Sequence, residues 1–160
     1  MAIKVGDKVP GTGLKTKTSE GIQDVPGDDL FAGKKVVLFA LPGAFTPTCS
    51  AKHLPGYASN AAALKAKGVD TIACLSVNDA FVMDAWGQSQ NVGDKVLMLA
   101  DGNADFTKAV GLEMDGSGYG MGTRSQRYAM VVENGIVKEL LVEAPGQFEV
   151  SSAEYVLSKL

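Results

Sequence analysis

A cysteine at position 49 has the surroundings of a reactive thiol. It follows the turn-forming stretch 42–48, which reads PGAFTPT. The apolar run 36–41 before this turn is typical of a buried strand, and 50–67 is rich in Ala, Leu and Lys, as helices are. The turn therefore delivers Cys49 to the first turn of a helix. The free N–H groups and the positive dipole end there favour a thiolate, which is the nucleophilic form of cysteine.

Strands and helices are predicted to alternate from position 35 onward, after a turn-rich start with short strand candidates at 13–18 and 22–25. Short apolar runs indicate strands, and Ala-rich or amphipathic stretches indicate helices. In chain order the predicted elements are a strand at 36–41, a helix at about 49–67, a strand at 69–77, a helix near 79–90, a strand at 96–100 and a brief helix at 105–110. Asn78 or Asp79 is expected to cap the helix near 79–90.

The end of the chain is predicted to form a hairpin and a helix. Asn134-Gly135 is the preferred dipeptide of a type I′ turn, so 127–133 and 136–142 should pair as antiparallel strands. A final helix should follow Ser151 or Ser152, with a capping box between Ser151 and Glu154.

This order of elements predicts an α/β fold. Parallel βαβ units, an antiparallel pair and a closing helix describe a mixed central sheet flanked by helices. That is the layout of the thioredoxin fold, here with an N-terminal extension and an insertion at about 91–123. Neither an internal repeat nor a long linker interrupts the chain, so residues 1–160 are expected to form one domain.

Composition excludes several classes of partner. The residues are 46% hydrophobic and 21% charged, the net charge is −3, and no basic block attracts nucleic acid or an anionic membrane. No apolar run approaches the roughly 20 residues of a membrane span. One histidine and two separated cysteines do not form a structural zinc site of the usual kind, so no metal is expected. Two cysteines suit a reducing compartment, and the cytoplasm is the expected location, with a removed organellar presequence left open.

The residues around Cys49 carry a resemblance to a known family. The stretch 42–49 resembles the Pro-x-x-x-Thr-x-x-Cys motif of peroxiredoxins, and PGAFTPTCS is similar to the type II, or peroxiredoxin-5-like, group in particular. The segments 76–79 (SVND) and 122–129 (GTRSQRYA) are also similar to that group. The resemblance covers almost the whole chain. It implies a thiol-dependent peroxidase for hydrogen peroxide and alkyl hydroperoxides, serving antioxidant defence without metal, haem or flavin.

The resemblance also implies a role for each residue of the motif. Cys49 would attack the peroxide and become a sulfenic acid. Thr46 would accept a hydrogen bond from the peroxide and help to orient Cys49. Pro42 would shield the pocket from water, while backbone N–H groups near Gly43 and Cys49 would bind the peroxide oxygens. Arg124 maps onto the active-site arginine of the family and would hold the thiolate charge.

Three further residues near the site have open roles. Arg127 is a second arginine candidate, although strand alternation could instead turn it to solvent. His53, the only histidine, lies four residues after Cys49 and roughly on the same helical face. It could act as a general base for the thiol, but a packing or interface role is favoured because the family relies on arginine. Pro55 should kink the helix or start a new turn.

Cys74 is either a resolving cysteine or an inert core thiol. Its place in the apolar pattern 71–77 favours the core. Some type II peroxiredoxins have a cysteine at the matching position that has been assigned as resolving. A Cys49–Cys74 disulfide needs Cα atoms within about 7 Å, which a helix start and a strand interior would reach only after local unfolding. In the rival one-cysteine cycle, glutathione or a glutaredoxin attacks the sulfenic acid. Either scheme requires an external thiol, from glutathione/glutaredoxin or thioredoxin.

Two other functions would use the same thiol, namely a redox sensor that signals to a partner and a thiol–disulfide reductase. The absence of a Cys-x-x-Cys pair argues against the reductase. The glycine-rich stretch 116–122 lacks phosphate-loop spacing and is expected to be a flexible loop that presents Arg124. The family resemblance implies a homodimer that makes contacts through the loop at 44–46.

Overall fold

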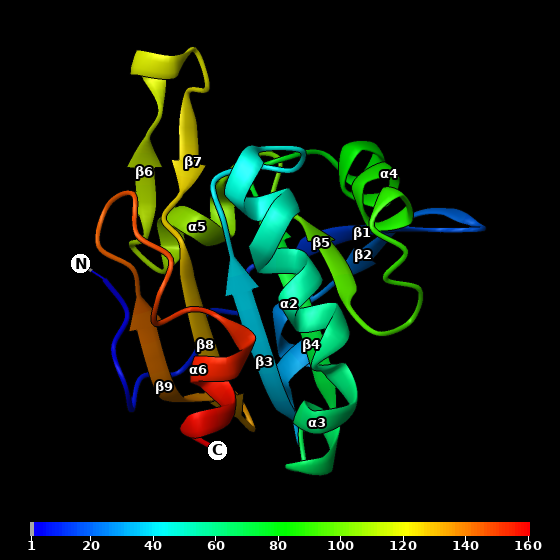
Figure 1. Ribbon diagram of the computed structural model, residues 1–160, viewed down its shortest axis with the longest axis vertical. Helices are drawn as coiled ribbons and strands as arrows, with labels where there is room; N and C mark the ends of the chain where they lie inside the picture. The colour runs from blue at the N-terminus through cyan, green and yellow to red at the C-terminus, as the bar shows by residue number, and fades with distance from the viewer. Residues whose placement is uncertain (1) are drawn as a thin grey trace.

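The computed structural model describes residues 2–160, and a mixed seven-stranded sheet lies at its centre (Figure 1). In order across the sheet, the strands are β2 (Gly21–Val25), β1 (Leu14–Thr18), β5 (Leu97–Ala100), β4 (Thr71–Ser76), β3 (Lys35–Ala40), β8 (Tyr128–Glu133) and β9 (Ile136–Val142). The central strands β3, β4 and β5 are parallel. Strand β8 runs antiparallel to β3, and β9 runs antiparallel to β8. The predicted mixed sheet of a thioredoxin-like fold is confirmed.

Helices cover both faces of this sheet. They are α1 (Gly27–Phe31), α2 (Leu54–Ser59), α3 (Ala61–Ala66), α4 (Ala80–Ser89), α5 (Asp105–Ala109) and α6 (Ala153–Ser158). Because side chains alternate along a strand, β3 contributes to two separate cores. Val37 and Phe39 pack with residues of α2, α3, α4 and α6, whereas Val36 and Leu38 pack with residues of α1 and α5. In Figure 1, α2, α3 and α6 lie in front of the sheet.

The predicted hairpin is present, with Asn134 and Gly135 at its turn. Their φ values are 48° and 80°, as a type I′ turn requires, and Gly and Asn tolerate such angles best. The pairing fixes the end of the sheet next to the turn that carries Cys49, because Tyr128 at the start of β8 lies opposite Ala40 at the end of β3.

The helix predicted at 49–67 is divided into three segments. A π turn, η1 (Cys49–His53), is followed by α2 and α3, which meet at Asn60. Pro55 stands at the start of α2 and has no N–H to donate, so the helix begins anew there, as predicted.

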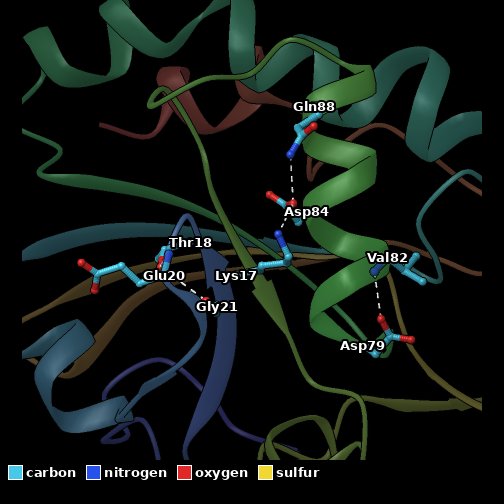
Figure 2. Close-up of polar contacts among 8 residues, drawn as sticks. All are labelled: Lys17, Thr18, Glu20, Gly21, Asp79, Val82, Asp84 and Gln88. Carbon is cyan, nitrogen blue, oxygen red and sulfur yellow. Dashed lines mark hydrogen bonds and ion pairs between the residues drawn. The ribbon is translucent and has the colours of Figure 1, made fainter.

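Figure 2 shows the N-terminal cap of helix α4 and the contact of this helix with β1. Its cap is Asp79, which accepts a hydrogen bond from the Val82 N–H at 2.8 Å, in agreement with the prediction. Asp84 in the middle of the helix pairs with Lys17 of β1 at 3.3 Å and accepts from Gln88 at 2.9 Å. Trp86, the only tryptophan of the chain, is fully buried and donates its ring N–H to Ser50 Oγ at 3.0 Å.

The structure adds detail to one predicted segment and contradicts the predicted cap of another. The stretch 116–122 is the tip of a hairpin between β6 (Glu113–Asp115) and β7 (Thr123–Ser125), and it contains a short 3-10 turn. The capping box from Ser151 is wrong, because Ser152 caps α6 by accepting from the Tyr155 N–H at 3.2 Å. The hydroxyl of Ser151 is occupied elsewhere, since it donates to Glu143 at 2.7 Å.

Within residues 2–160, none of the helices combines the length and the apolar character that crossing a bilayer demands.

Candidate active site

Cys49 lies where the predicted strand-to-helix turn places it, in the first turn of the helical segment after β3. Its side chain is fully buried. The helix is locally widened here, because the N–H of Leu54 donates to the Cys49 carbonyl five residues back. Such π turns are rare and are found frequently at functional sites. In the preceding loop, Phe45 adopts a left-handed φ of 62°, an uncommon conformation for an aromatic residue.

Arg127 is the cation at the thiol. Its Nη2 donates to Cys49 Sγ at 3.1 Å. The register of the sheet explains this position, because Arg127 directly precedes β8 and the first residue of β8 lies opposite the last residue of β3. A guanidinium cannot lose its proton in a protein, so it presents a permanent positive charge to the sulfur. A cation at this distance can stabilise negative charge that develops at the sulfur during a reaction.

His53 binds the other side of the same guanidinium. Arg127 Nη1 lies 2.7 Å from His53 Nδ1, and His53 Nε2 lies 3.1 Å from the Ser151 carbonyl oxygen. Arginine can only donate, so Nδ1 must accept and the ring proton must be on Nε2, which donates to Ser151. Burial, and to a lesser extent the charge of Arg127, lower the pKa of His53 to about 3. The ring is therefore neutral near pH 7, and no hydrogen bond joins it to the sulfur among residues 2–160.

Aromatic rings enclose the guanidinium and the imidazole. Phe148 lies under Arg127, with the guanidinium carbon 5.8 Å from the ring centroid, and packs edge-on against His53 at 5.0 Å. Phe39 also packs against His53, with ring centroids 5.0 Å apart, and stacks on Tyr57 at 3.9 Å. These contacts hold the half-buried guanidinium and the buried imidazole in place beside the thiol.

The Ser151 carbonyl is itself fixed. It accepts a second hydrogen bond from the Tyr57 hydroxyl at 2.7 Å. The Ser151 N–H and hydroxyl donate to one oxygen of Glu143 at 2.8 and 2.7 Å, and the Glu149 N–H donates to the same oxygen at 2.7 Å. Burial disfavours the charge of this carboxylate, but the hydrogen bonds from Ser151 and Glu149 outweigh it and lower the pKa of Glu143.

The loop before Cys49 is tightly packed around Gly43. Thr46 Oγ1 donates to the Gly43 carbonyl at 2.6 Å, which leaves the oxygen lone pairs of the hydroxyl free to accept. A Cβ on Gly43 would lie 3.0 Å from Arg124 Nη1 and 3.2 Å from Thr46 Cγ2, so glycine alone fits without displacement. A cleft of about 410 Å³ opens beside the loop, and Pro42, Thr48, Met114, Gln126 and Arg127 are among its lining residues.

Comparison with known proteins identifies the family to which this site belongs. The family model described as Redoxin matches residues 4–157. Peroxiredoxin-2E, chloroplastic, of Arabidopsis thaliana is 48% identical over 163 residues, which cover 99% of this chain and 70% of that protein. Peroxiredoxin-2C of the same plant is 47% identical over 159 residues, 99% of this chain and 98% of its own. The chain is a type II peroxiredoxin.

A solved structure supports the same assignment. Reduced Prx3 from Vibrio vulnificus, in complex with H2O2, has a TM-score of 0.95 and 61% identity, and the match covers 98% of each chain. The predicted resemblance is thereby confirmed, and this peroxiredoxin is an antioxidant thiol peroxidase that reduces peroxides with electrons from a thiol reductant.

One predicted site residue of this peroxiredoxin requires correction. Arg124 does not contact the thiol; its Nε donates to the Met121 carbonyl at 3.0 Å and its Nη1 to the Pro42 carbonyl at 3.3 Å. Arg124 does not reach the thiol because it lies in the β6–β7 hairpin and not at the start of β8. It braces the loop that carries Pro42 and Gly43, and Arg127 occupies the position that had been expected for it.

Cys74 lies in the interior of the central sheet. Its strand is paired on both sides, with Cys74 opposite Phe39 of β3 and Met98 of β5. The side chain is fully buried, and both cysteines are free thiols. Burial raises the pKa of Cys74, and a negative charge on Cys49 would raise it further. The strand predicted for this cysteine is therefore present, and its side chain belongs to the same buried cluster as Cys49.

Two parts of the site went unrecognised in the sequence. The bond between His53 and Arg127 was missed, although both residues had been singled out. The contribution of the segment 143–151 was also missed, because it depends on backbone carbonyls and a carboxylate far away along the chain. The one signal for Arg127 in the sequence was the hairpin strand predicted at 127–133, which begins at this residue. Among residues 2–160, no three His, Cys, Asp or Glu side chains gather as a metal site would require.

Proposed function

We propose that Cys49 is the residue that reduces the peroxide. Its thiolate attacks one oxygen of ROOH, so that an S–O bond forms and the O–O bond breaks. The sulfur is oxidised to the sulfenic acid Cys49–SOH, and the other oxygen takes a proton and leaves as ROH, which is water for hydrogen peroxide. The observation that carries this proposal is the hydrogen bond of 3.1 Å from Arg127 to the sulfur of a cysteine in the first turn of a helical segment.

The neighbouring residues have complementary roles in this proposal. Arg127 holds the thiolate and, with backbone N–H groups of Gly43 and Cys49, stabilises the charge that develops on the leaving oxygen. Thr46 accepts a hydrogen bond from the peroxide, which suits a hydroxyl whose own proton is already donated to a carbonyl. Pro42 covers the site at the edge of the cleft.

An external thiol resets the enzyme in this scheme, and Cys74 stays reduced. The support is that Cys74 is fully buried inside a central strand while Cys49 opens a helical segment, so that a disulfide between them would require local unfolding. The thiol attacks the sulfenic sulfur, water leaves, and a second thiol equivalent releases Cys49. Glutathione with a glutaredoxin and thioredoxin are the two reductants to compare. Two free thiols in one chain also suit a reducing compartment such as the cytoplasm.

Alkyl hydroperoxides are included as substrates, because the cleft beside Arg127 contains apolar surface from Pro42 and Met114. A homodimer formed next to the loop 44–46 is also part of the proposal. Phe45 and Phe81 are 56% and 60% exposed, and their segments are tied together by a hydrogen bond from the Ala44 N–H to Asn78 at 3.0 Å. Large apolar side chains exposed on neighbouring segments suit an interface between two copies of the chain.

The test is peroxide consumption by the wild type, Cys49→Ser and Cys74→Ser, each supplied with glutathione–glutaredoxin or with thioredoxin. Loss of turnover in Cys49→Ser alone would support a one-cysteine cycle, and the faster reductant would be assigned. Loss in both variants, with a Cys49–Cys74 disulfide found by mass spectrometry, would make Cys74 the thiol that attacks the sulfenic acid, and the external thiol would then reduce the disulfide. Full activity of Cys49→Ser would refute the proposed chemistry.

A further inference from the structure

His53 is a buried titratable side chain bonded to the active-site arginine, and the peroxide chemistry has no use for it. Both of its ring nitrogens are engaged, one by Arg127 and one by the Ser151 carbonyl. The ring is fully buried and is held between Phe39, Tyr57 and Phe148, with centroid distances of 5.0, 5.6 and 5.0 Å. Its orientation is therefore determined by packing on its faces and by a hydrogen bond at each nitrogen.

The guanidinium of Arg127 depends on this ring for its orientation. Within residues 2–160, its side-chain hydrogen bonds go to Cys49 and to His53. The cation–π contact with Phe148 constrains the plane of the guanidinium but allows it to rotate within that plane. The bond from Nη1 to His53 prevents this rotation, and it thereby directs Nη2 at the sulfur.

A neutral acceptor suits this position better than a charged one. A carboxylate would also orient Arg127, but it would neutralise the guanidinium and compete with the thiolate for it. A neutral imidazole accepts the bond and leaves the positive charge available to the sulfur. The second ring nitrogen, Nε2, donates to the Ser151 carbonyl and so anchors the ring. This carbonyl is held in turn by the Tyr57 hydroxyl, which donates to it at 2.7 Å.

We propose that His53 is a positioning residue for the peroxide reaction, which holds the Arg127 guanidinium against the Cys49 thiolate through a hydrogen bond accepted at Nδ1. The proposal rests on the proposed function of Cys49. It assigns to His53 neither proton transfer nor contact with the peroxide. The Ser151 carbonyl then orients Arg127 indirectly, because it holds the His53 ring to which Arg127 donates.

The two nitrogens can be tested separately by two amide variants. The amide of His53→Asn reaches the place of Nδ1 and can accept from Arg127, whereas that of His53→Gln reaches the place of Nε2 and can bond only to Ser151. The readout is the rate constant for oxidation of Cys49 by hydrogen peroxide, followed by rapid quenching, alkylation and mass spectrometry. His53→Gln should lose about ten- to hundredfold, as expected for a lost bond to a charged group, and His53→Asn should stay within about threefold of the wild type.

A double-mutant cycle with Arg127→Gln separates positioning from a general loss of structure. If His53 acts through Arg127, adding His53→Gln to Arg127→Gln will cause little further loss. Unfolded molecules would react as a separate slow phase and would not distort the rate of the folded ones. Wild-type rates in both His53 variants, or losses that multiply in the cycle, would overturn the proposal. Wild-type peroxide consumption by Cys49→Ser would instead overturn the proposed function itself.

Discussion

The single histidine makes the stability of this peroxiredoxin depend on pH in a window where few other groups titrate. The pKa of His53 is lowered from 6.5 to about 3, chiefly by burial and then by Arg127. As the pH falls below 6.5, the unfolded chain takes up the proton while the folded chain does not, and this favours unfolding. The stabilisation from the neutral ring is thus complete above pH 6.5 and is lost as the pH falls toward 3.

The size of this loss follows from the two pKa values. Each pH unit between them costs about 1.4 kcal/mol, so we expect a loss of about 2 kcal/mol at pH 5 and about 5 kcal/mol at pH 3. At pH 5 most carboxylates are still ionised, since their ordinary pKa values are about 4. The pKa of Glu143 is lowered by its hydrogen bonds and lies further outside the window.

Urea unfolding at pH 7.5 and at pH 5.0 measures the effect, with His53→Asn as the control that has no titrating ring. The wild type should lose about 2 kcal/mol more than the variant between these pH values. Equal losses in the two proteins would show that His53 takes up its proton in the fold, and the description of a buried neutral ring between Arg127 and Ser151 would then be wrong.

Three further predictions concern the site and its support. Arg127→Gln should slow the oxidation of Cys49 by about ten- to hundredfold. Arg124→Gln removes only bonds to backbone carbonyls, so its rate constant should remain within about tenfold of the wild type. Stopped-flow kinetics with hydrogen peroxide will measure both rate constants, and equal losses would contradict the prediction. Thr46→Val should lower the same rate constant while Thr46→Ser preserves it, because only serine keeps the acceptor oxygen; a fast valine variant would exclude the hydroxyl from the reaction. Glu143→Gln should destabilise the fold at pH 7 by about 1.5–3 kcal/mol, since its carboxylate accepts three hydrogen bonds. Because the pKa of Glu143 is lowered, this difference should be present above about pH 4 and shrink below it, and a urea comparison that stays constant with pH would refute it.

Much of the fold could be predicted because its signals are local. The dipeptide Asn134-Gly135 predicts a type I′ turn at its own position, and Asp79 predicts the start of α4. In each case the residues that specify the structure are close together along the chain. The division of the helix after Cys49 was harder to predict. Composition indicates a helix over 49–67, but the π turn depends on how the chain widens before Pro55, and no short-range pattern specifies that.

The site divides in the same way. The place of Cys49 follows from a strand, a turn and a helix that are consecutive in the sequence. The choice between Arg124 and Arg127 depends instead on the register between β3 and β8, which are almost 90 residues apart. The contact of His53 with the Ser151 carbonyl spans 98 residues and involves a backbone atom, which a side-chain pattern cannot reveal.

The hydrogen bond from Trp86 to Ser50 has a practical consequence for experiments on this enzyme. The chain contains one tryptophan, and the ring N–H of that residue is bonded to the side chain directly after Cys49. A movement of the π turn on oxidation of the sulfur would displace Ser50, which is the hydrogen-bond partner of the indole. We therefore expect the fluorescence of Trp86 to follow the oxidation of Cys49 without a label or a coupled enzyme.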